Sequence, residues 1–365
     1  MNSHRCWAEI DLAALRHNAE IARRCLGPEV AILAVIKANA YGHGLAQIAR
    51  ALAQQVQLFG VANLQEAIET RAAVPHPVMI LGPALPEERS DIVAQRFIPS
   101  ISNYDEALAF DRAASSSSVA INVAIDTGMG RMGLSEQEAT NEVRKISQLP
   151  KVEIHSISTH LPVADENPSF TEAQLSRFTR LVARLRAETP GKYQIHVLPS
   201  AGVLGFGAAA FDFVRVGLML YGVSPLPHLQ DRLRPVLTLK SRVALLRELP
   251  AGSSISYGRT FITQRSTRVA TLSVGYADGL PRVVSGRGAS VLVGGRRCAV
   301  LGRVTMDLTM VDVTNVNGAA VGDEAVLIGN QGNEQILAME VAKHASTIAW
   351  EIFTGIGSRV TRVYV

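Results

Sequence analysis

The chain has 365 residues, of which 47% are hydrophobic and 19% are charged, values typical of a soluble, enzyme-like globular protein. Its net charge of +4 is spread along the sequence without a Lys/Arg block, which disfavours nucleic acid binding. No apolar run approaches the roughly 20 residues of a membrane-spanning helix, so no membrane segment is expected.

Eight short apolar runs alternate with helical patterns through the first two thirds of the chain. Continuous rather than alternating apolar runs are typical of parallel strands buried on both faces. Amphipathic patterns such as 44–56 and 63–74 separate them, and a further helix is expected over 11–27. This alternation predicts a (β/α)8 barrel over residues 11–233. The runs cover 31–38, 58–63, 77–82, 97–102, 118–126, 152–160, 193–200 and 213–222.

After residue 234 the pattern changes to β-rich segments bounded by Gly, Asn and Asp turns. This change predicts a second, mainly-β domain over 234–365, with a boundary in the Pro-containing stretch 224–236. Residues 1–10 are assigned to the same domain, because "CWAEIDL" (6–12) could supply it with an extra strand. The fold class is therefore α/β, an N-terminal barrel with a C-terminal mainly-β domain.

Polar residues of reactive types stand at the ends of five barrel strands, where barrel enzymes place their chemistry. Each alone has an ordinary explanation: a strand-end lysine is usually a solvated cap, and a lone histidine or arginine is usually structural. Their predicted meeting at one rim favours a shared site. They are Lys37, Asp126, Arg131, His160, Ser200 and Arg215.

Lys37 is unusual because lysine is scarce, with six of the 36 basic residues, and because it ends the apolar run "AILAVIKA". Burying an ammonium is costly, so this lysine either reaches water or is an amine kept for chemistry. An amine that loses its proton in a barrel mouth can condense with an aldehyde. Ser200 and Gly217 suit a phosphate. A phosphorylated aldehyde held by a lysine is pyridoxal 5'-phosphate.

Seven motifs resemble those of the alanine racemase family, in order and over nearly the whole chain. They are "AVIKANAYGHG", "DTGMGRMG", "STHLPVADE", "RVGLMLYG", "SISYGRTF", "SVGYADG" and "LGRVTMD". The resemblance implies interconversion of L- and D-alanine by two bases on opposite faces of the substrate. It makes Lys37 the base that carries pyridoxal phosphate, and Tyr257 of the partner subunit the other base. Each active site would then be shared within a homodimer.

The same resemblance assigns the remaining site residues. His160 and Arg215 would form a chain with Tyr257 that lowers the pKa of its phenol, and Arg215 would also face the pyridine nitrogen. The phosphate would meet Tyr41, Ser200, Gly217, Leu218 and Ser358. The substrate carboxylate would meet Arg131 and the backbone N–H of Met306 from the partner. Tyr276 would line the entrance, with Asp165 and Arg303 farther out.

Two positions depart from the family pattern. Many relatives carry a carbamylated lysine at the place of Ala124, where it orients the arginine. If Arg131 is half-buried, it needs another partner; we expect a chloride, a water or a nearby side chain. Many relatives also carry a tyrosine at the place of Ser358, so this pocket is expected to admit side chains larger than methyl, such as that of serine.

Other classes of function stay open. A broad-specificity amino acid racemase is the nearest alternative, followed by a pyridoxal phosphate-dependent decarboxylase, against which Arg215 argues, and a non-enzymatic carrier of the cofactor, against which the β domain argues. Cys6, Cys25 and Cys298 lie outside any CxxC spacing, so neither a disulfide framework nor a metal site is expected. The N-terminus lacks a secretory apolar core, and a cytoplasmic protein is expected.

Overall fold

The computed structural model describes residues 4–115, 117–189 and 191–365. Residues 1–3 of the N-terminal segment, which the sequence assigns to the β domain, lie outside this part. The chain divides into two compact units. The barrel unit comprises Leu15–Ala40 and Leu45–Leu233, and the β unit comprises the chain up to Ala14, Tyr41–Gly44 and Arg234–Val365.

The barrel unit is a closed parallel sheet, as the alternating pattern predicts. Its strands follow the order β5-β4-β3-β2-β10-β9-β8-β6, and β5 also pairs with β6, which closes the ring. Each of the eight apolar runs supplies one of these strands. Their bounds are β2 Ala31–Val35, β3 Leu58–Val61, β4 Val78–Ile80, β5 Ile98–Ile101, β6 Val119–Asp126, β8 Val152–Ser158, β9 Gln194–His196 and β10 Phe213–Val216, with the two-residue β7 Leu134–Ser135 beside β6.

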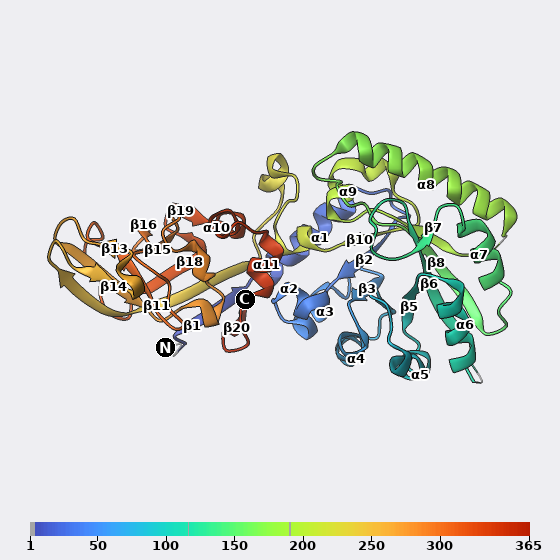
Figure 1. The fold of residues 1–365 in the computed structure, drawn as a ribbon, viewed down its shortest axis with the longest axis horizontal. Helices are drawn as coiled ribbons and strands as arrows, with labels where there is room; N and C mark the ends of the chain where they lie inside the picture. The colour runs from blue at the N-terminus through green and yellow to red at the C-terminus, as the bar shows by residue number, and fades with distance from the viewer. Residues whose placement is uncertain (1–3, 116, 190) are drawn as a thin grey trace. The chain divides into compact units, whose positions relative to one another are not determined.

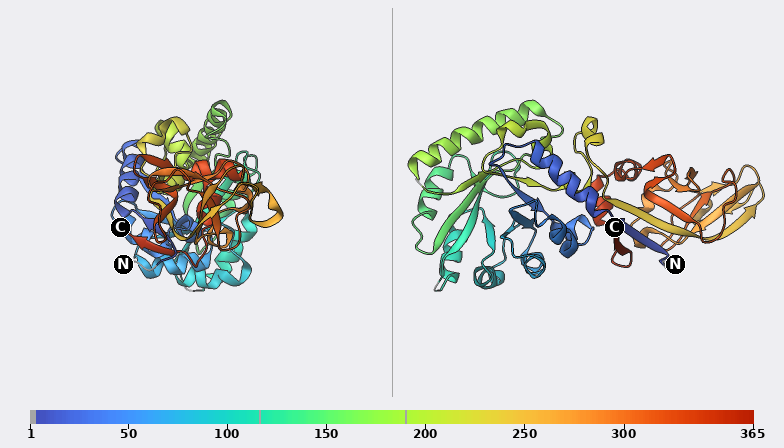
Figure 2. Two further views of the ribbon diagram at one scale, coloured as in Figure 1. Left: turned by 90° about the vertical axis from the view of Figure 1, so that its left-hand side faces the viewer. Right: turned by 180° about the vertical axis from the view of Figure 1, so that it is seen from behind.

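The strands form a barrel because their side chains are buried on both faces: every residue of β3, β4, β5 and β10 is buried. The connecting helices lie outside the ring, and α8 is the long helix that runs along it (Figures 1 and 2). The helices are α1 Leu12–Arg24, α3 Leu45–Leu52, α4 Leu64–Ala73, α5 Arg89–Ala94, α6 Tyr104–Ala113, α7 Ala139–Ile146, α8 Pro168–Glu188 and α9 Ser200–Phe206, with short 3-10 turns at η1 Pro86–Glu88, η2 Gly207–Ala209 and η4 Pro227–Arg232.

Three apolar runs end differently from the prediction. In the run 193–200 the strand ends at His196, and Ser200 begins the helix α9. The run 31–38 leaves the strand after Val35, and Lys37 begins the single turn α2, Lys37–Tyr41. The run 213–222 is a strand only to Val216, and its second half is the 3-10 turn η3, Leu218–Tyr221. These departures fall at the carboxyl ends of the strands, the face on which barrel enzymes build their active sites.

The β unit is a sheet with the order β16-β15-β18-β11-β1-β20, extended by β14, β17 and β19. The predicted N-terminal strand is present: β1 pairs antiparallel with β11 and parallel with β20. The elements are β1 Cys6–Ile10, β11 Leu237–Leu249, β12 Ser254–Ile255, β13 Phe261–Ile262, β14 Thr267–Leu272, β15 Ser290–Val293, β16 Arg296–Ala299, β17 Thr309–Asp312, β18 Glu324–Gln331, β19 Glu334–Ile336 and β20 Thr361–Tyr364, the helices α10 Ala338–Ala345 and α11 Ala349–Thr354, and the turns η5 Tyr257–Arg259, η6 Tyr276–Asp278 and η7 Arg282–Val284.

The helices of the structure can be compared with the expectation that the chain has no membrane segment. In the part of the chain that the structure describes, no helix combines the length and the apolar character needed to cross a bilayer.

Candidate active site

Lys37 lies at the carboxyl end of β2, two residues after the strand ends, and is half-buried. Burial lowers the pKa of its ammonium, and the positive charge of Arg131 lowers it further. Glu66 acts in the opposite direction, because its carboxylate favours the charged amine. The pKa of this half-buried amine is therefore shifted below its usual value, in the direction of the neutral form.

The turn after Lys37 is left-handed over four consecutive residues other than glycine. Ala38, Asn39, Ala40 and Tyr41 have φ between 51° and 54°. For L-residues this conformation costs on the order of 1–2 kcal/mol each, so other contacts must hold it. The Glu66 carboxylate does so: it accepts hydrogen bonds from the N–H of Asn39 at 3.2 Å and of Ala62 at 2.9 Å.

Arg215, on β10, is 8% exposed, and both terminal nitrogens of its guanidinium contact acceptors of the barrel. One nitrogen donates to the carbonyls of Thr159 at 2.6 Å and Val197 at 3.1 Å, and it lies 3.3 Å from the Nδ1 atom of His160. Burial and the charge of Arg131 lower the pKa of Arg215 to about 10, so the residue remains a cation at neutral pH. A buried, fixed positive charge thus stands within the rim.

His160 follows β8 and shares the electrostatic environment of the other rim residues. Burial, together with the positive charges of Arg215, Arg131 and Lys37, lowers the pKa of its imidazole to about 3. The ring is therefore neutral at physiological pH. Because Arg131 acts on Lys37, His160 and Arg215 alike, these four predicted residues are neighbours in the fold.

The sequence analysis did not identify a row of buried, hydrogen-bonded polar side chains that begins at Arg215. The Nδ1 atom of His196 makes a short hydrogen bond with the Arg215 guanidinium, and its Nε2 atom lies 3.0 Å from the side-chain oxygen of Asn122. Asn122 also accepts from the Ser156 hydroxyl at 3.0 Å. A histidine and an asparagine inside otherwise apolar runs, "YQIHVLPS" and "SVAINVAID", were the available signal, because buried polar groups require partners.

Ser200 and the turn η3 form a small backbone cradle. The Ser200 hydroxyl accepts from the N–H of Gly217 at 3.0 Å and of Met219 at 3.3 Å. Between them, the N–H of the buried Leu218 has no acceptor among the residues that the structure describes. A buried N–H without a partner at the start of a helical turn fits a phosphate oxygen. These residues therefore fit the phosphate of the cofactor implied by the sequence.

Arg131 lies in the loop "DTGMGRMG" after β6, which Asp126 shapes. The Asp126 carboxylate accepts from the N–H groups of Gly128 and Met129, each at 2.8 Å, and of Gly130 at 2.7 Å. Asp126 thus organises the loop and is not free for chemistry. The expectation that Arg131 is half-buried is wrong for the single chain, in which Arg131 is exposed. The argument that desolvation beside Ala124 demands a bound anion therefore does not apply to this state.

Most of the other predicted residues belong to the β unit. Tyr257 is 68% exposed, Met306 53% and Tyr276 41%, which is unusual for side chains with such large apolar surfaces. Ser358 is exposed on the loop before β20, whereas burial raises the pKa of Tyr41 to about 12. Of the two outer residues, Arg303 is half-buried in the β unit and Asp165 is exposed in the barrel unit.

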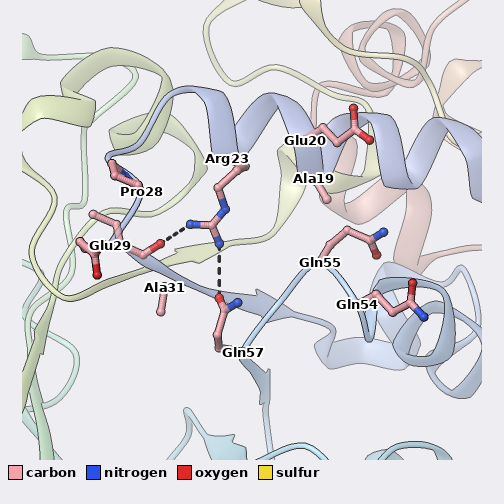
Figure 3. Close-up of a pocket in the computed structure, with 10 residues that line it drawn as sticks. Ala19, Glu20, Arg23, Pro28, Glu29, Ala31, Gln54, Gln55 and Gln57 are labelled. Carbon is pink, nitrogen blue, oxygen red and sulfur yellow. Dashed lines mark hydrogen bonds between the residues drawn. The ribbon is translucent and has the colours of Figure 1, made fainter.

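A separate pocket of about 460 Å³ lies at the other end of β2 (Figure 3). It is lined by Arg23 of α1, by Ala31 where β2 begins, and by Gln55 and Gln57 of the loop before β3. Arg23 donates to the carbonyl of Val30 and, at 3.3 Å, to the side chain of Gln57. At the amino-terminal face of a barrel such contacts serve stability rather than catalysis.

Sequence comparisons agree over the full length of the chain. The family model of the alanine racemase N-terminal domain matches residues 10–225, and that of the C-terminal domain matches residues 236–364. Alanine racemase of Halothermothrix orenii is 41% identical over 98% of this chain and 96% of its own length. That of Methylacidiphilum infernorum is 42% identical over 99% of this chain and 92% of its own length.

Solved structures agree as well. Alanine racemase of Clostridium difficile superposes with a TM-score of 0.94 at 31% identity, covering 100% of this chain and 97% of its own. The Bacillus anthracis enzyme with bound L-Ala-P has a TM-score of 0.92 at 31% identity, covering 100% and 96%. The Bartonella henselae enzyme with covalently bound pyridoxal phosphate has a TM-score of 0.90 at 28% identity, covering 99% and 100%.

Proposed function

Because this chain belongs to the alanine racemase family, a pyridoxal phosphate-dependent family, we propose that it interconverts L- and D-alanine with Lys37 and Tyr257 as its two bases. The observation that carries the assignment is the Lys37 amine at the barrel rim, beside Arg131 and with its pKa lowered by burial. Racemisation requires a proton to leave one face of Cα and another to arrive on the opposite face, and two different bases do this without turning the substrate.

Tyr257 supplies the second base across a dimer. Its exposure in the single chain supports this role, because a phenol open to solvent on one subunit is available to the rim of another. In the proposed link from Tyr257 through His160 to Arg215, His160 carries no charge of its own. The imidazole is neutral and its Nδ1 atom lies 3.3 Å from the Arg215 guanidinium, so it acts as a neutral hydrogen-bond relay between Arg215 and Tyr257 of the partner.

Pyridoxal phosphate, when bound, supplies the electron-withdrawing ring that makes the Cα proton of an amino acid acidic. On this chain, Lys37 carries it, and Arg215 faces its ring nitrogen. The unpaired N–H of Leu218 supports the placement of the phosphate, which also meets Tyr41, Ser200, Gly217 and Ser358. A permanently charged guanidinium keeps the ring nitrogen unprotonated, which favours immediate return of the proton over side reactions such as transamination.

The substrate carboxylate binds between the exposed guanidinium of Arg131 and the backbone N–H of Met306 from the partner. Among the described residues, this N–H donates no hydrogen bond, so it is available to an anion. Tyr276 lines the entrance, and its exposure supports such a place. The proposal includes a homodimer with shared sites, because the family resemblance brings Tyr257 and Met306 of one subunit to Lys37 of the other. The three free cysteines, two of them buried, suit a reducing compartment such as the cytoplasm.

Two assays test the reaction and the site. Chiral chromatography of the purified, yellow holoenzyme with L-alanine should show formation of D-alanine until the two enantiomers are equal. Borohydride reduction followed by mass spectrometry should find the cofactor fixed to Lys37. Carbon dioxide release from basic amino acids without racemisation, or label on a different lysine, would contradict the proposal.

Substrate breadth is tested at Ser358, whose side chain is smaller than a tyrosine by an aromatic ring. We propose that the pocket admits serine as well as alanine. The ratio of kcat/KM for L-serine to that for L-alanine should fall in the Ser358→Tyr variant, while turnover of L-alanine persists. A wild-type enzyme with strict preference for alanine over L-serine and L-lysine would refute the wider pocket.

A further inference from the structure

A cluster of three charged side chains joins the turns that carry Tyr276 and Met306. We name it the Arg359 cluster; it comprises Arg359, Asp278 and Asp307. The Nε atom of Arg359 donates to one oxygen of Asp278 at 2.7 Å, and an Nη atom donates to the other at 3.1 Å. The same Nη atom donates to Asp307 at 2.6 Å. One guanidinium therefore ties η6, the turn 305–308 and the loop of Ser358 together.

Asp278 anchors the inner side of this cluster. It is 5% exposed, and besides the Arg359 fork it accepts from the N–H of Gly275 at 2.8 Å. Its backbone carbonyl accepts from the N–H of Gly357 at 3.4 Å. The buried carboxylate needs its donors from Arg359 and Gly275, because an unpaired charge in this position would be strongly destabilising.

The two turns are also locked to each other through their backbones. Tyr276 donates to the carbonyl of Thr305 at 3.0 Å, and Ala277 donates to that of Met306 at 3.1 Å. The approach is so close that a Cβ atom on Gly275 would lie 2.3 Å from the carbonyl oxygen of Met306. The peptide plane that presents the Met306 N–H is therefore set by η6, and η6 is held by Asp278.

We propose that Arg359 is a positioning residue for substrate: through Asp278 and Asp307 it fixes the Met306 N–H and the ring of Tyr276 for the carboxylate of the amino acid. The inference rests on the proposed function, which gives those two residues their roles. Arg359 does not itself touch the substrate. It acts on binding, because a displaced donor weakens the hold on the carboxylate before and during the reaction alike.

Geometry rather than net charge is what Arg359 contributes. Its side chain is 48% exposed, and the cluster borders an open pocket of about 390 Å³, so water and salt screen its charges. A planar guanidinium can grip both oxygens of Asp278 and reach Asp307 at once, whereas a lysine ammonium is a point donor on a flexible stem. Arg359→Lys therefore preserves the charge and removes the fork.

The chain offers a matched control in Arg297. Its guanidinium also forks onto two carboxylates, Glu334 at 2.9 Å and Glu340 at 2.5 Å, on a different part of the β unit. We expect Arg359→Lys to raise KM for L-alanine roughly three- to tenfold, with kcat changed less than about twofold. Arg297→Lys should leave both near the wild-type values. Asp307→Asn, which removes one arm of the cluster, should raise KM by a smaller factor and provides the test if Arg359→Lys folds poorly.

Hydrogen exchange separates this inference from the proposed function. Backbone amides of 275–279 and 305–308 should exchange faster in Arg359→Lys than in wild type or Arg297→Lys, whatever reaction the protein catalyses. Unchanged exchange in both turns, or an equal rise of KM in the two lysine variants, would overturn the positioning role. If the exchange rates change as expected but the wild-type holoenzyme does not racemise alanine, the proposed function fails and the structural role of Arg359 stands.

Discussion

At the scale of single residues, the arginines Arg131 and Arg215 lie at the same rim of the barrel as the Lys37 amine. Burial and the charge of Arg131 lower the pKa of the Lys37 ammonium, and burial with Arg215, Arg131 and Lys37 lowers the pKa of the His160 imidazole to about 3. A neutral amine is the form that attacks an aldehyde and the form that accepts a proton. Burial and Arg131 thus shift Lys37 in the direction that its two proposed roles need.

Replacing Arg215 tests the role of its charge. Arg215→Glu removes the donors to the carbonyls of Thr159 and Val197 and places an acid opposite the ring nitrogen. We expect racemisation to fall by about two orders of magnitude, with pyruvate appearing as a product of transamination. Arg215→Lys, which keeps the charge, should retain more activity and release less pyruvate. Chiral chromatography and a pyruvate assay measure both, and a Glu variant with wild-type turnover and no pyruvate would contradict the argument.

The neutral His160 also predicts how stability depends on pH. In the unfolded chain a histidine binds a proton below about 6.5, but burial and three cations lower the pKa of His160 to about 3 in the fold. Between these values the unfolded state binds more protons. The free energy of unfolding should therefore fall as pH is lowered from 6.5, by up to about 1.4 kcal/mol per pH unit for this residue.

Urea unfolding at pH 7.5, 6.5 and 5.5 measures this loss. His196, whose pKa burial also lowers strongly, contributes a decline of the same sign. His160→Gln should show a shallower decline than wild type across the same interval. Equal slopes for the two proteins would mean that His160 titrates alike in the folded and unfolded states.

At the scale of elements, Lys37 begins the left-handed turn that follows β2. Its sequence, "KANAY", gives no warning, because alanine is the best former of right-handed helices and strongly disfavours the left-handed form. Contacts outside the turn support the conformation, among them the Glu66 carboxylate, which accepts from the N–H of Asn39, and the Asn39 side chain, which accepts from the N–H of Leu45. Local propensity could not reveal it.

Glu66→Ala tests whether this carboxylate holds the turn. Two hydrogen bonds to a charged acceptor disappear, and we expect a loss of about 2 kcal/mol in the free energy of unfolding together with weaker retention of pyridoxal phosphate. Glu69→Ala, an exposed carboxylate on the same helix α4, is the control and should resemble wild type. Urea unfolding and absorbance of the bound cofactor after dialysis report the two effects. Equal behaviour of the two variants would assign the turn to other contacts.

There is a physical reason why the sequence predicts some features of the structure and not others. Apolar runs specify the eight barrel strands, because burial on both faces leaves the sequence little alternative. The rim residues follow from the barrel, since strand ends meet at one face. Glu66, Asn122 and Arg359 could not be found this way. Each acts through partners far away in sequence, and a helix N-terminus, a strand interior or a surface loop would accept the same residue types for ordinary reasons.

At the scale of the whole molecule, the account requires two chains. Tyr257 and Met306 are exposed on the β unit, and Lys37, His160 and Arg215 lie in the barrel unit. Activity per subunit should therefore fall on dilution into the range where the dimer dissociates, in step with the loss of dimer measured by sedimentation. A monomer with full activity would remove the need for a partner.

Subunit complementation tests the shared site most directly. Lys37→Ala and Tyr257→Phe should each abolish most racemisation as separate homodimers. When the two variants are mixed and allowed to exchange subunits, half of the dimers become mixed, and each mixed dimer regains one site with both bases. The account predicts recovery to roughly one quarter of wild-type activity, from the two-fold symmetry of the assembly. Activity no greater than the sum of the two variants, after exchange has been verified by mass spectrometry, would contradict it.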